Sequence, residues 1–215
     1  MEILCHSILF DSDGVLVDSH AHGRQAWSQI SHEFGFVLDD EVFRSLAGIR
    51  PADSLARFVN PSRLHEAVSR LEDLEVELAA VTPSIPGAPR LVSTIPDGRW
   101  AVVTSAGRRL GLARWTGADI SLPRVVVAAE DVTKGKPDPE PYLSAARQLG
   151  VDNADCLVVE DSPGGGQAGF AAGAMVLAVG TQEWPSRPTW RVPDLSAVQC
   201  NTTNDGLLSI TINAT

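Results

Sequence analysis

Residues 3–14, Ile-Leu-Cys-His-Ser-Ile-Leu-Phe-Asp-Ser-Asp-Gly, join an apolar run to two aspartates that stand two positions apart. The near-continuous apolarity of Ile3–Phe10 predicts a strand buried on both faces of a parallel sheet. If extended geometry continues past the strand, Asp11 and Asp13 point the same way. Two carboxylates that close repel one another unless a cation neutralises them or one is protonated. The pattern therefore indicates either a cation site or a turn with two capping aspartates.

Four further apolar runs, each followed by polar or small residues, predict four more strands: Trp100–Thr104, Val125–Ala129, Cys156–Glu160 and Met175–Val179. Helical stretches lie between or after them, at Arg108–Thr116, Pro139–Leu149 and Gly165–Ala172. This alternation of strand and helix is typical of an α/β fold with a doubly wound parallel sheet. We predict that fold class for the chain.

The segment from about Ser19 to Thr82 breaks the alternation, because it contains no convincing strand. Its last part has apolar residues at helical spacing: Leu64, Val68, Leu71, Leu74, Leu78 and Val81. We predict a small helical domain over 19–82, inserted into a main domain formed by 1–18 and 83–215. Near the end of the chain, Gln182–Thr189 is expected to be a loop. Asp205-Gly206 predicts a turn before a short edge strand at Leu207–Ile212.

The composition restricts the possible partners. A net charge of -10 argues against a nucleic-acid-binding surface, which needs basic patches. No apolar run approaches the roughly 18–20 residues of a membrane span, and the opening residues do not resemble a signal peptide. Cys5, Cys156 and Cys200 have no metal-ligand spacing and are expected to be buried free thiols. We therefore expect a cytoplasmic protein.

Three more polar elements stand at or just beyond the ends of predicted strands. Thr104-Ser105 offers a hydroxyl and backbone amides that can hold a phosphate oxygen, although both residue types are also common helix caps. Lys136 precedes a proline, which limits its backbone, although it also fits a solvated loop lysine. Glu160-Asp161 offers the oxygen ligands that suit Mg²⁺, or a cap for the next helix.

Taken together, these elements favour a ligand site over four separate ordinary explanations. Ligands of open α/β sheets bind at the carboxyl ends of the strands, near the point where the strand order reverses. Carboxylate pair, hydroxyl, lysine and second carboxylate pair all follow predicted strands. We expect them to converge on one crevice.

The chain resembles the haloacid dehalogenase superfamily over essentially its whole length. The matching stretches are FDSDG at Phe10–Gly14, VVTSAG at Val102–Gly107, KGKPDPEPYL at Lys134–Leu143 and VVEDSPGGGQAGFAAGA at Val158–Ala174. The resemblance implies a Rossmann-like core and makes the inserted helical unit a cap. WAVVTSAG, RLEDLE and Val192–Ser196 are similar to the corresponding stretches of the bacterial and fungal phosphatases of hexitol phosphates, 2-deoxyglucose 6-phosphate and glycerol phosphate.

The resemblance implies a role for each element. Asp11 would attack phosphorus and form a transient aspartyl-phosphate, and Asp13 would act as acid and then as base. Mg²⁺ would bind Asp11, the backbone carbonyl of Asp13, Asp161 and, through water, Glu160. Thr104, Lys136 and the amide of Ser105 would hold phosphate oxygens. Ser12 and the triple glycine Gly164–Gly166 depart from the family pattern; we expect the Ser12 side chain to point away from the metal.

The cap would select the substrate, a small phosphorylated metabolite such as a sugar or polyol phosphate. Gly48 and Arg50 lie in a stretch that resembles the family's specificity loop, and Trp27 either lines the pocket or packs in the cap core. β-Phosphoglucomutase chemistry would need a histidine four residues before Trp27, where this chain has Gly23. Phosphonate hydrolysis would need a cap lysine, which 19–82 lacks. A phosphoglycolate phosphatase and a catalytically silent sugar-phosphate-binding module remain alternatives. The oligomeric state is open, with a monomer slightly favoured.

Overall fold

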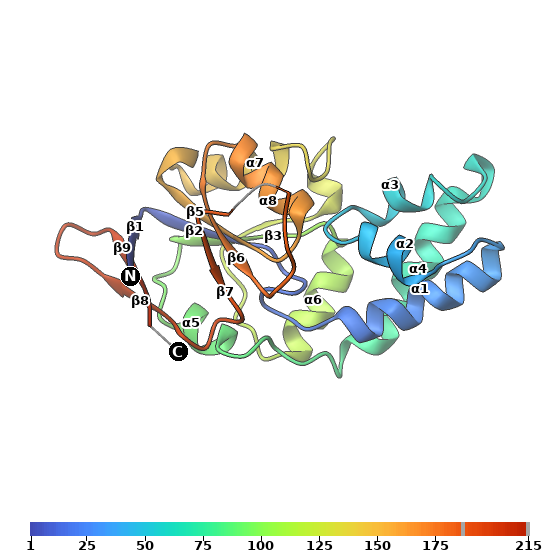
Figure 1. Cartoon of the computed structure of the whole chain (residues 1–215), viewed down its shortest axis with the longest axis horizontal. Helices are drawn as coiled ribbons and strands as arrows, with labels where there is room; N and C mark the ends of the chain where they lie inside the picture. Colours follow the sequence, from blue (N-terminus) through green and yellow to red (C-terminus); the bar gives the residue numbers. More distant parts are fainter. Residues whose placement is uncertain (186–187, 214–215) are drawn as a thin grey trace.

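The computed structural model describes residues 1–185 and 188–213, and its centre is a parallel sheet of six strands (Figure 1). The strand order is β4-β3-β2-β5-β6-β7. The strands are β2 (Ser7–Phe10), β3 (Trp100–Val103), β4 (Val125–Val127), β5 (Cys156–Glu160), β6 (Met175–Val179) and β7 (Trp190–Val192). From β2 the chain adds β3 and β4 on one side, then β5, β6 and β7 on the other, which confirms the doubly wound α/β prediction.

Helices cover both faces of this sheet, so its strands are apolar on both sides. Ile8 and Phe10 of β2 pack in a core with Trp115, whereas Leu9 packs on the opposite face with Tyr142. One face is covered by α5 (Ala88–Ser93) and α6 (Arg108–Gly117), the other by α7 (Glu140–Leu149) and α8 (Pro163–Ala171). The short 3₁₀ turns Ala129–Asp131 and Asn153–Asp155 lie in connections.

The first predicted strand is wrong in one respect, because Ile3–Phe10 forms two strands. β1 (Glu2–Cys5) ends before His6, and β2 starts after it. The His6 amide donates to the carbonyl of Asp155, and the His6 carbonyl accepts from the Arg99 guanidinium. These bonds divert the backbone, so β1 joins a separate antiparallel sheet of order β1-β9-β8. Figure 1 shows that sheet at the end of the molecule opposite the inserted helices.

The C-terminal segment completes the second sheet. β8 (Val198–Thr202) and β9 (Leu208–Ile212) are joined by the predicted turn, in which Gly206 has a φ of 84°. The prediction of an edge strand is wrong, because β9 pairs with both β1 and β8. Part of the predicted loop Gln182–Thr189, residues 186–187, lies outside the described residues, and the rest is irregular. It leads into β7, which the sequence analysis did not predict.

The insertion is helical, as predicted. It comprises α1 (His20–Phe34), α2 (Asp40–Ser45), α3 (Pro51–Leu55), the 3₁₀ turn Pro61–Arg63 and α4 (Leu64–Ala79). Ile30, Leu55 and Leu71 centre its own apolar cluster. Val81 does not belong to the predicted stripe, since it follows α4 and is exposed. The chain leaves and re-enters the main body side by side, because Asp18 donates to the carbonyl of Pro83. Domain boundaries at 18/19 and 82/83 remain a prediction.

Two further expectations concern the whole chain. All three cysteines are buried and free, as predicted. Among the described residues, no helix is both long and apolar enough to cross a membrane.

Candidate active site

The predicted carboxylates of the site gather at the carboxyl ends of β2 and β5. These two strands are neighbours, and the chain adds strands in opposite directions from them. Asp11 follows β2 and Asp161 follows β5, and the Asp11 amide still donates to the carbonyl of Val159 at 2.9 Å. The two carboxylates therefore meet at the crevice where ligands of open α/β sheets bind.

Lys136 lies buried behind Asp11 with all three of its ammonium hydrogens used. Its Nζ donates to Asp11 Oδ1 at 2.5 Å, to Glu160 Oε1 at 2.7 Å and to the carbonyl of Val103 at 3.0 Å. Lys136 is 2% exposed, so water does not compete for these bonds. The lysine is a fixed charge beside Asp11 rather than a mobile surface group.

Glu160 holds this lysine and shapes the turn that follows β5. Its Oε1 also accepts from the Tyr142 hydroxyl at 2.9 Å. Its Oε2 accepts from the amides of Asp161 and Ser162 and from the Ser162 hydroxyl, at 2.9 to 3.0 Å. Five donors leave this carboxylate little capacity for a metal or for a metal-bound water.

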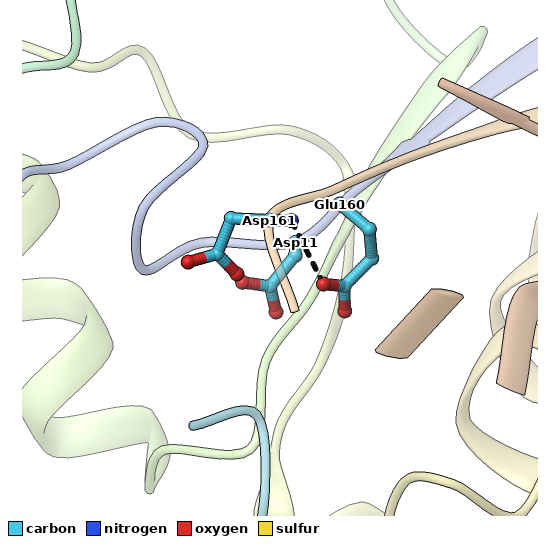
Figure 2. Close-up of side chains that lie close together, drawn as sticks. All are labelled: Asp11, Glu160 and Asp161. Atoms are coloured by element: carbon cyan, nitrogen blue, oxygen red, sulfur yellow. Dashed lines mark hydrogen bonds between the residues drawn. The ribbon is translucent and has the colours of Figure 1, made fainter. Parts of the chain in front are cut away.

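Asp161 is the carboxylate best placed beside Asp11. Figure 2 shows their side chains adjacent, with the hydrogen bond from the Asp161 amide to Glu160 dashed. One oxygen from each of Asp11, Glu160 and Asp161 lies within 4.8 Å of the others. Gly14 (φ 79°) makes room for Asp161, because a Cβ on Gly14 would lie 2.1 Å from Asp161 Oδ2.

The site contains more buried negative than positive charge. Burial raises the pKa of Asp11 to about 7; Lys136 opposes this, while Glu160 and Asp13 add to it. Burial, Glu160 and Asp11 raise the pKa of Asp161 well above its usual value. Burial acts to lower the pKa of Lys136, but Asp11 and Glu160 outweigh it and the pKa is raised. Because oxygen ligands and excess negative charge suit a divalent cation, Asp11 and Asp161 fit Mg²⁺.

Asp13 points toward a second charged group. Its Oδ1 accepts from the Ser19 hydroxyl at 2.5 Å and from Arg114 at 2.8 Å. Arg114 is buried on α6 and also donates to Glu75 of α4 at 2.9 Å. The second aspartate of the pair is thus connected to the inserted helices through one arginine.

Thr104 and Ser105 follow β3, and Gly48 lies in the inserted unit close to them. Thr104 is buried, and its Oγ1 accepts from the amide of Ala106, which leaves its hydroxyl hydrogen for another acceptor. The Ser105 hydroxyl donates to the carbonyl of Gly48 at 2.7 Å. The predicted phosphate-binding turn therefore contacts the predicted specificity loop of the cap. Gly48 (φ 75°) approaches Ser162 closely, since a Cβ there would lie 2.3 Å from the Ser162 hydroxyl.

Arg50 is engaged elsewhere. Its guanidinium pairs with Asp53 at 2.7 Å and donates to the carbonyl of Val132 at 3.2 Å, and its stem covers Gly135. In this structure Arg50 fastens the cap loop to the main body instead of lining the central cavity. Its predicted contact with a substrate stays a prediction.

A cavity of about 220 Å³ lies between the inserted helices and the sheet. Asp11, Asp13 and Asp161 line its sheet side, and Trp27 and Gly48 line its cap side. Trp27 is 7% exposed and also packs in the cap cluster, so both interpretations of this residue hold. The volume is below the roughly 300–1,000 Å³ of drug-sized pockets and suits a small molecule.

Sequence reasoning missed Ser19, Glu75 and Arg114. Glu75 carried a signal, because it stands four residues after Leu71 and therefore on the predicted buried face of the helix. No sequence feature pairs it with Arg114.

The two departures from the family pattern have local causes. Ser12 points away from the cavity, as expected, and accepts a hydrogen bond from the buried indole of Trp115 at 2.9 Å. A Cβ on Gly165 would lie 1.6 Å from Glu160, and one on Gly166 would lie 2.3 Å from Trp184. Two of the three glycines therefore allow close packing.

Comparisons with known proteins found related phosphatases and a solved structure with the same fold. Hexitol phosphatase A of Escherichia coli (strain K12) is 37% identical over 180 residues, covering 81% of this chain and 83% of that protein. Validoxylamine A 7'-phosphate phosphatase of Streptomyces hygroscopicus subsp. limoneus is 36% identical over 184 residues, covering 80% and 84%. A solved hydrolase from Pseudomonas syringae shares the fold with a TM-score of 0.81 at 20% identity, over 89% of this chain and 94% of that one.

A family model described as haloacid dehalogenase-like hydrolase matches residues 8–179, from β2 to β6 and including the inserted helices. The chain belongs to the haloacid dehalogenase-like hydrolase family.

Proposed function

We propose that the protein is a Mg²⁺-dependent phosphatase that hydrolyses small sugar or polyol phosphates through an aspartyl-phosphate on Asp11. The observation that carries the proposal is the position of Asp11. It follows the carboxyl end of β2, lies beside Asp161 and accepts a hydrogen bond from the buried Lys136. Family relatives named as phosphatases of a hexitol phosphate and of validoxylamine A 7'-phosphate support the reaction class.

Two carboxylates divide the chemistry. Asp11 forms a bond from its carboxylate oxygen to phosphorus as the bond from phosphorus to the alcohol oxygen breaks, and Asp13 gives its proton to that oxygen. Asp13 then takes a proton from water, whose oxygen attacks phosphorus and releases the Asp11 carboxylate and inorganic phosphate. Asp13 must turn toward the reacting oxygen, because Ser19 and Arg114 hold it here.

The surrounding residues hold the phosphate during the reaction. Asp11, Asp161 and the backbone carbonyl of Asp13 would hold Mg²⁺, which when bound screens the repulsion between the nucleophile and the phosphate. Lys136 favours the ionised form of Asp11 and offers charge to the phosphoryl oxygens. Thr104 and the Ser105 amide are placed at the end of β3, where they would hold further oxygens.

Hydrolysis is favoured over the mutase alternative by the cap residue at position 23. Gly23 has no side chain that could act on a second hydroxyl, and the nearest atom to a Cβ there would be Glu75 Oε1, at 3.8 Å. The protein would therefore deliver the phosphoryl group to water.

The test is phosphate release from a panel of sugar, polyol and small-acid phosphates, each with Mg²⁺ and with a chelator. Asp11→Asn is the control variant. Metal-dependent turnover that Asp11→Asn abolishes is the expected result, and the ranking across the panel distinguishes polyol phosphates from phosphoglycolate. Conversion of β-glucose 1-phosphate to glucose 6-phosphate, without phosphate release, would instead establish a mutase. Binding of sugar phosphates without any turnover would establish a silent binding module.

A further inference from the structure

Glu75 is a buried acid on an otherwise apolar face of the cap. It is 7% exposed on α4, between the packed residues Leu71, Leu74 and Ala79. It lines the same cavity as Asp11 and Asp13. A carboxylate is rarely buried without a partner for its charge and its lone pairs.

The partner of Glu75 satisfies only part of that need. Arg114 donates to Glu75 Oε1, and its other terminal nitrogen donates to Asp13. One guanidinium is thus divided between two carboxylates instead of forming the two-pronged pair that a structural ion pair favours. Within residues 1–185 and 188–213, Glu75 Oε2 has no hydrogen-bond donor, although Glu75 borders the cavity.

The space around this carboxylate is open on the cavity side. Gly23 of α1 faces it without a side chain, with 3.8 Å between Glu75 Oε1 and the position of a Cβ. The cavity holds four lining carboxylates, Asp11, Asp13, Glu75 and Asp161, against two lining arginines, Arg44 and Arg114. Arg114 already pairs with two of these four carboxylates, Asp13 and Glu75.

We propose that Glu75 is a specificity-determining residue that accepts hydrogen bonds from hydroxyl groups of the alcohol portion of the substrate. The inference rests on the proposed phosphatase function and narrows its substrate class to monophosphates of uncharged, polyhydroxylated alcohols. A hydroxyl supplies the donor that Glu75 Oε2 lacks. A phosphorylated acid such as phosphoglycolate brings a second negative charge and no donor, so the same residue disfavours it.

The test compares Glu75→Gln, which removes the charge, and Glu75→Leu, which removes charge and acceptor. Glu77→Gln is the matched control, since it is the same change on an exposed residue of the same helix. The kcat/KM for glucitol 6-phosphate is divided by that for p-nitrophenyl phosphate, which carries no hydroxyl. We expect this ratio to fall about 10-fold in Glu75→Gln and about 100-fold in Glu75→Leu, as for lost hydrogen bonds to a charged group. The phosphoglycolate ratio should rise, and Glu77→Gln should match the wild type.

Equal losses on glucitol 6-phosphate and p-nitrophenyl phosphate would overturn the inference, because they would show a structural role only. If Glu75→Leu does not fold, Glu75→Gln alone carries the comparison. A binding measurement separates the inference from the proposed function. Calorimetric titration of glucitol 6-phosphate with Mg²⁺ into Asp11→Asn and into Asp11→Asn/Glu75→Gln should show about 10-fold weaker binding in the double variant. A wild type silent on every phosphate, with that difference in binding intact, would refute the phosphatase and retain the role of Glu75. Equal dissociation constants would refute the role.

Discussion

Replacing Gly165 by alanine should displace Glu160 and thereby disturb the hydrogen bonds that hold Lys136 beside Asp11. The added Cβ would lie 1.6 Å from Glu160 Oε1 and 2.0 Å from the carboxylate carbon. Since real contacts of a Cβ stay above 3.0 Å, the carboxylate or the start of α8 must move by more than 1 Å. The atom that is displaced is the one to which Lys136 and Tyr142 donate.

The magnitude follows from those two bonds. A hydrogen bond to a charged group contributes about 1.5–3 kcal/mol, and a buried partner left without one costs a similar amount. Losing the Tyr142 bond and weakening the Lys136 bond therefore lowers the free energy of unfolding by about 3–5 kcal/mol. For a chain of this size, that corresponds to a fall in Tm of roughly 10 °C.

Urea denaturation of Gly165→Ala and Gly164→Ala measures the effect, with kcat as the second readout. Gly164 is the matched control, because it is the preceding residue of the same helix and a Cβ there meets nothing within 4 Å. We expect Gly164→Ala to change stability by less than about 1 kcal/mol, with the sign set by helix propensity. If the two variants differ by less than about 1 kcal/mol, Glu160 is free to move and does not position Lys136.

Three other changes test separate contacts. Ser12→Ala leaves the buried Trp115 indole without its acceptor and should cost about 1–3 kcal/mol in urea denaturation; adding Trp115→Phe should cost less than the sum of the single changes, and strict additivity would contradict the pairing. With a chelator, Tm should fall as the pH rises from about 5 to 8, because burial raises the pKa of Asp11 and of Glu75 to about 7, above their unfolded values, so the folded state binds more protons in this range. Mg²⁺ should raise Tm more at pH 8 than at pH 5, and a chelated Tm that rises with pH would be inconsistent with these pKa values. Gly48→Ala, at a φ of 75° and against the Ser162 hydroxyl, should lower kcat/KM by about 10²-fold through a displaced cap loop; wild-type kinetics would show that the cap does not dock this way.

Most of the central sheet could be predicted, because strands buried on both faces are apolar along nearly their whole length, as in Cys156–Val159. β7 lacks this signal, since it is short and its Arg191 is exposed. For the second sheet, the local sequence pattern predicts a strand but not its place in the sheet. In β9 the apolar Leu208 and Ile210 point to one side and the polar Ser209 between them is also buried, a pattern that indicates a strand but not whether it has one neighbour or two. The division at His6 depends on bonds to Asp155 and Arg99, both distant in sequence, so no local pattern reveals it.

The same distinction applies to the candidate site. Asp11, Lys136, Glu160 and Asp161 could be predicted to converge, because parallel topology brings strand ends together whatever their separation along the chain. Glu75 and Arg114 meet because α4 of the insertion packs beside α6 of the main body. That contact depends on how an inserted unit docks, which neither periodicity nor strand order specifies.

Charge balance connects the two ends of the cavity. Lys136 serves Asp11 and Glu160, and Arg114 serves Asp13 and Glu75, so each cation is shared by two carboxylates. Within residues 1–185 and 188–213, Asp161 is a further acidic group that has no ion-pair partner of its own, and burial raises its pKa. A phosphate monoester entering beside ionised Asp11 and Asp161 would meet repulsion, which an additional positive charge such as Mg²⁺ would offset. At the Glu75 end the same surplus of acceptors favours hydroxyl groups, which donate hydrogen bonds without adding charge. The shortage of cations thus supports both the proposed metal at the phosphate and the proposed preference for a neutral, hydroxyl-rich alcohol.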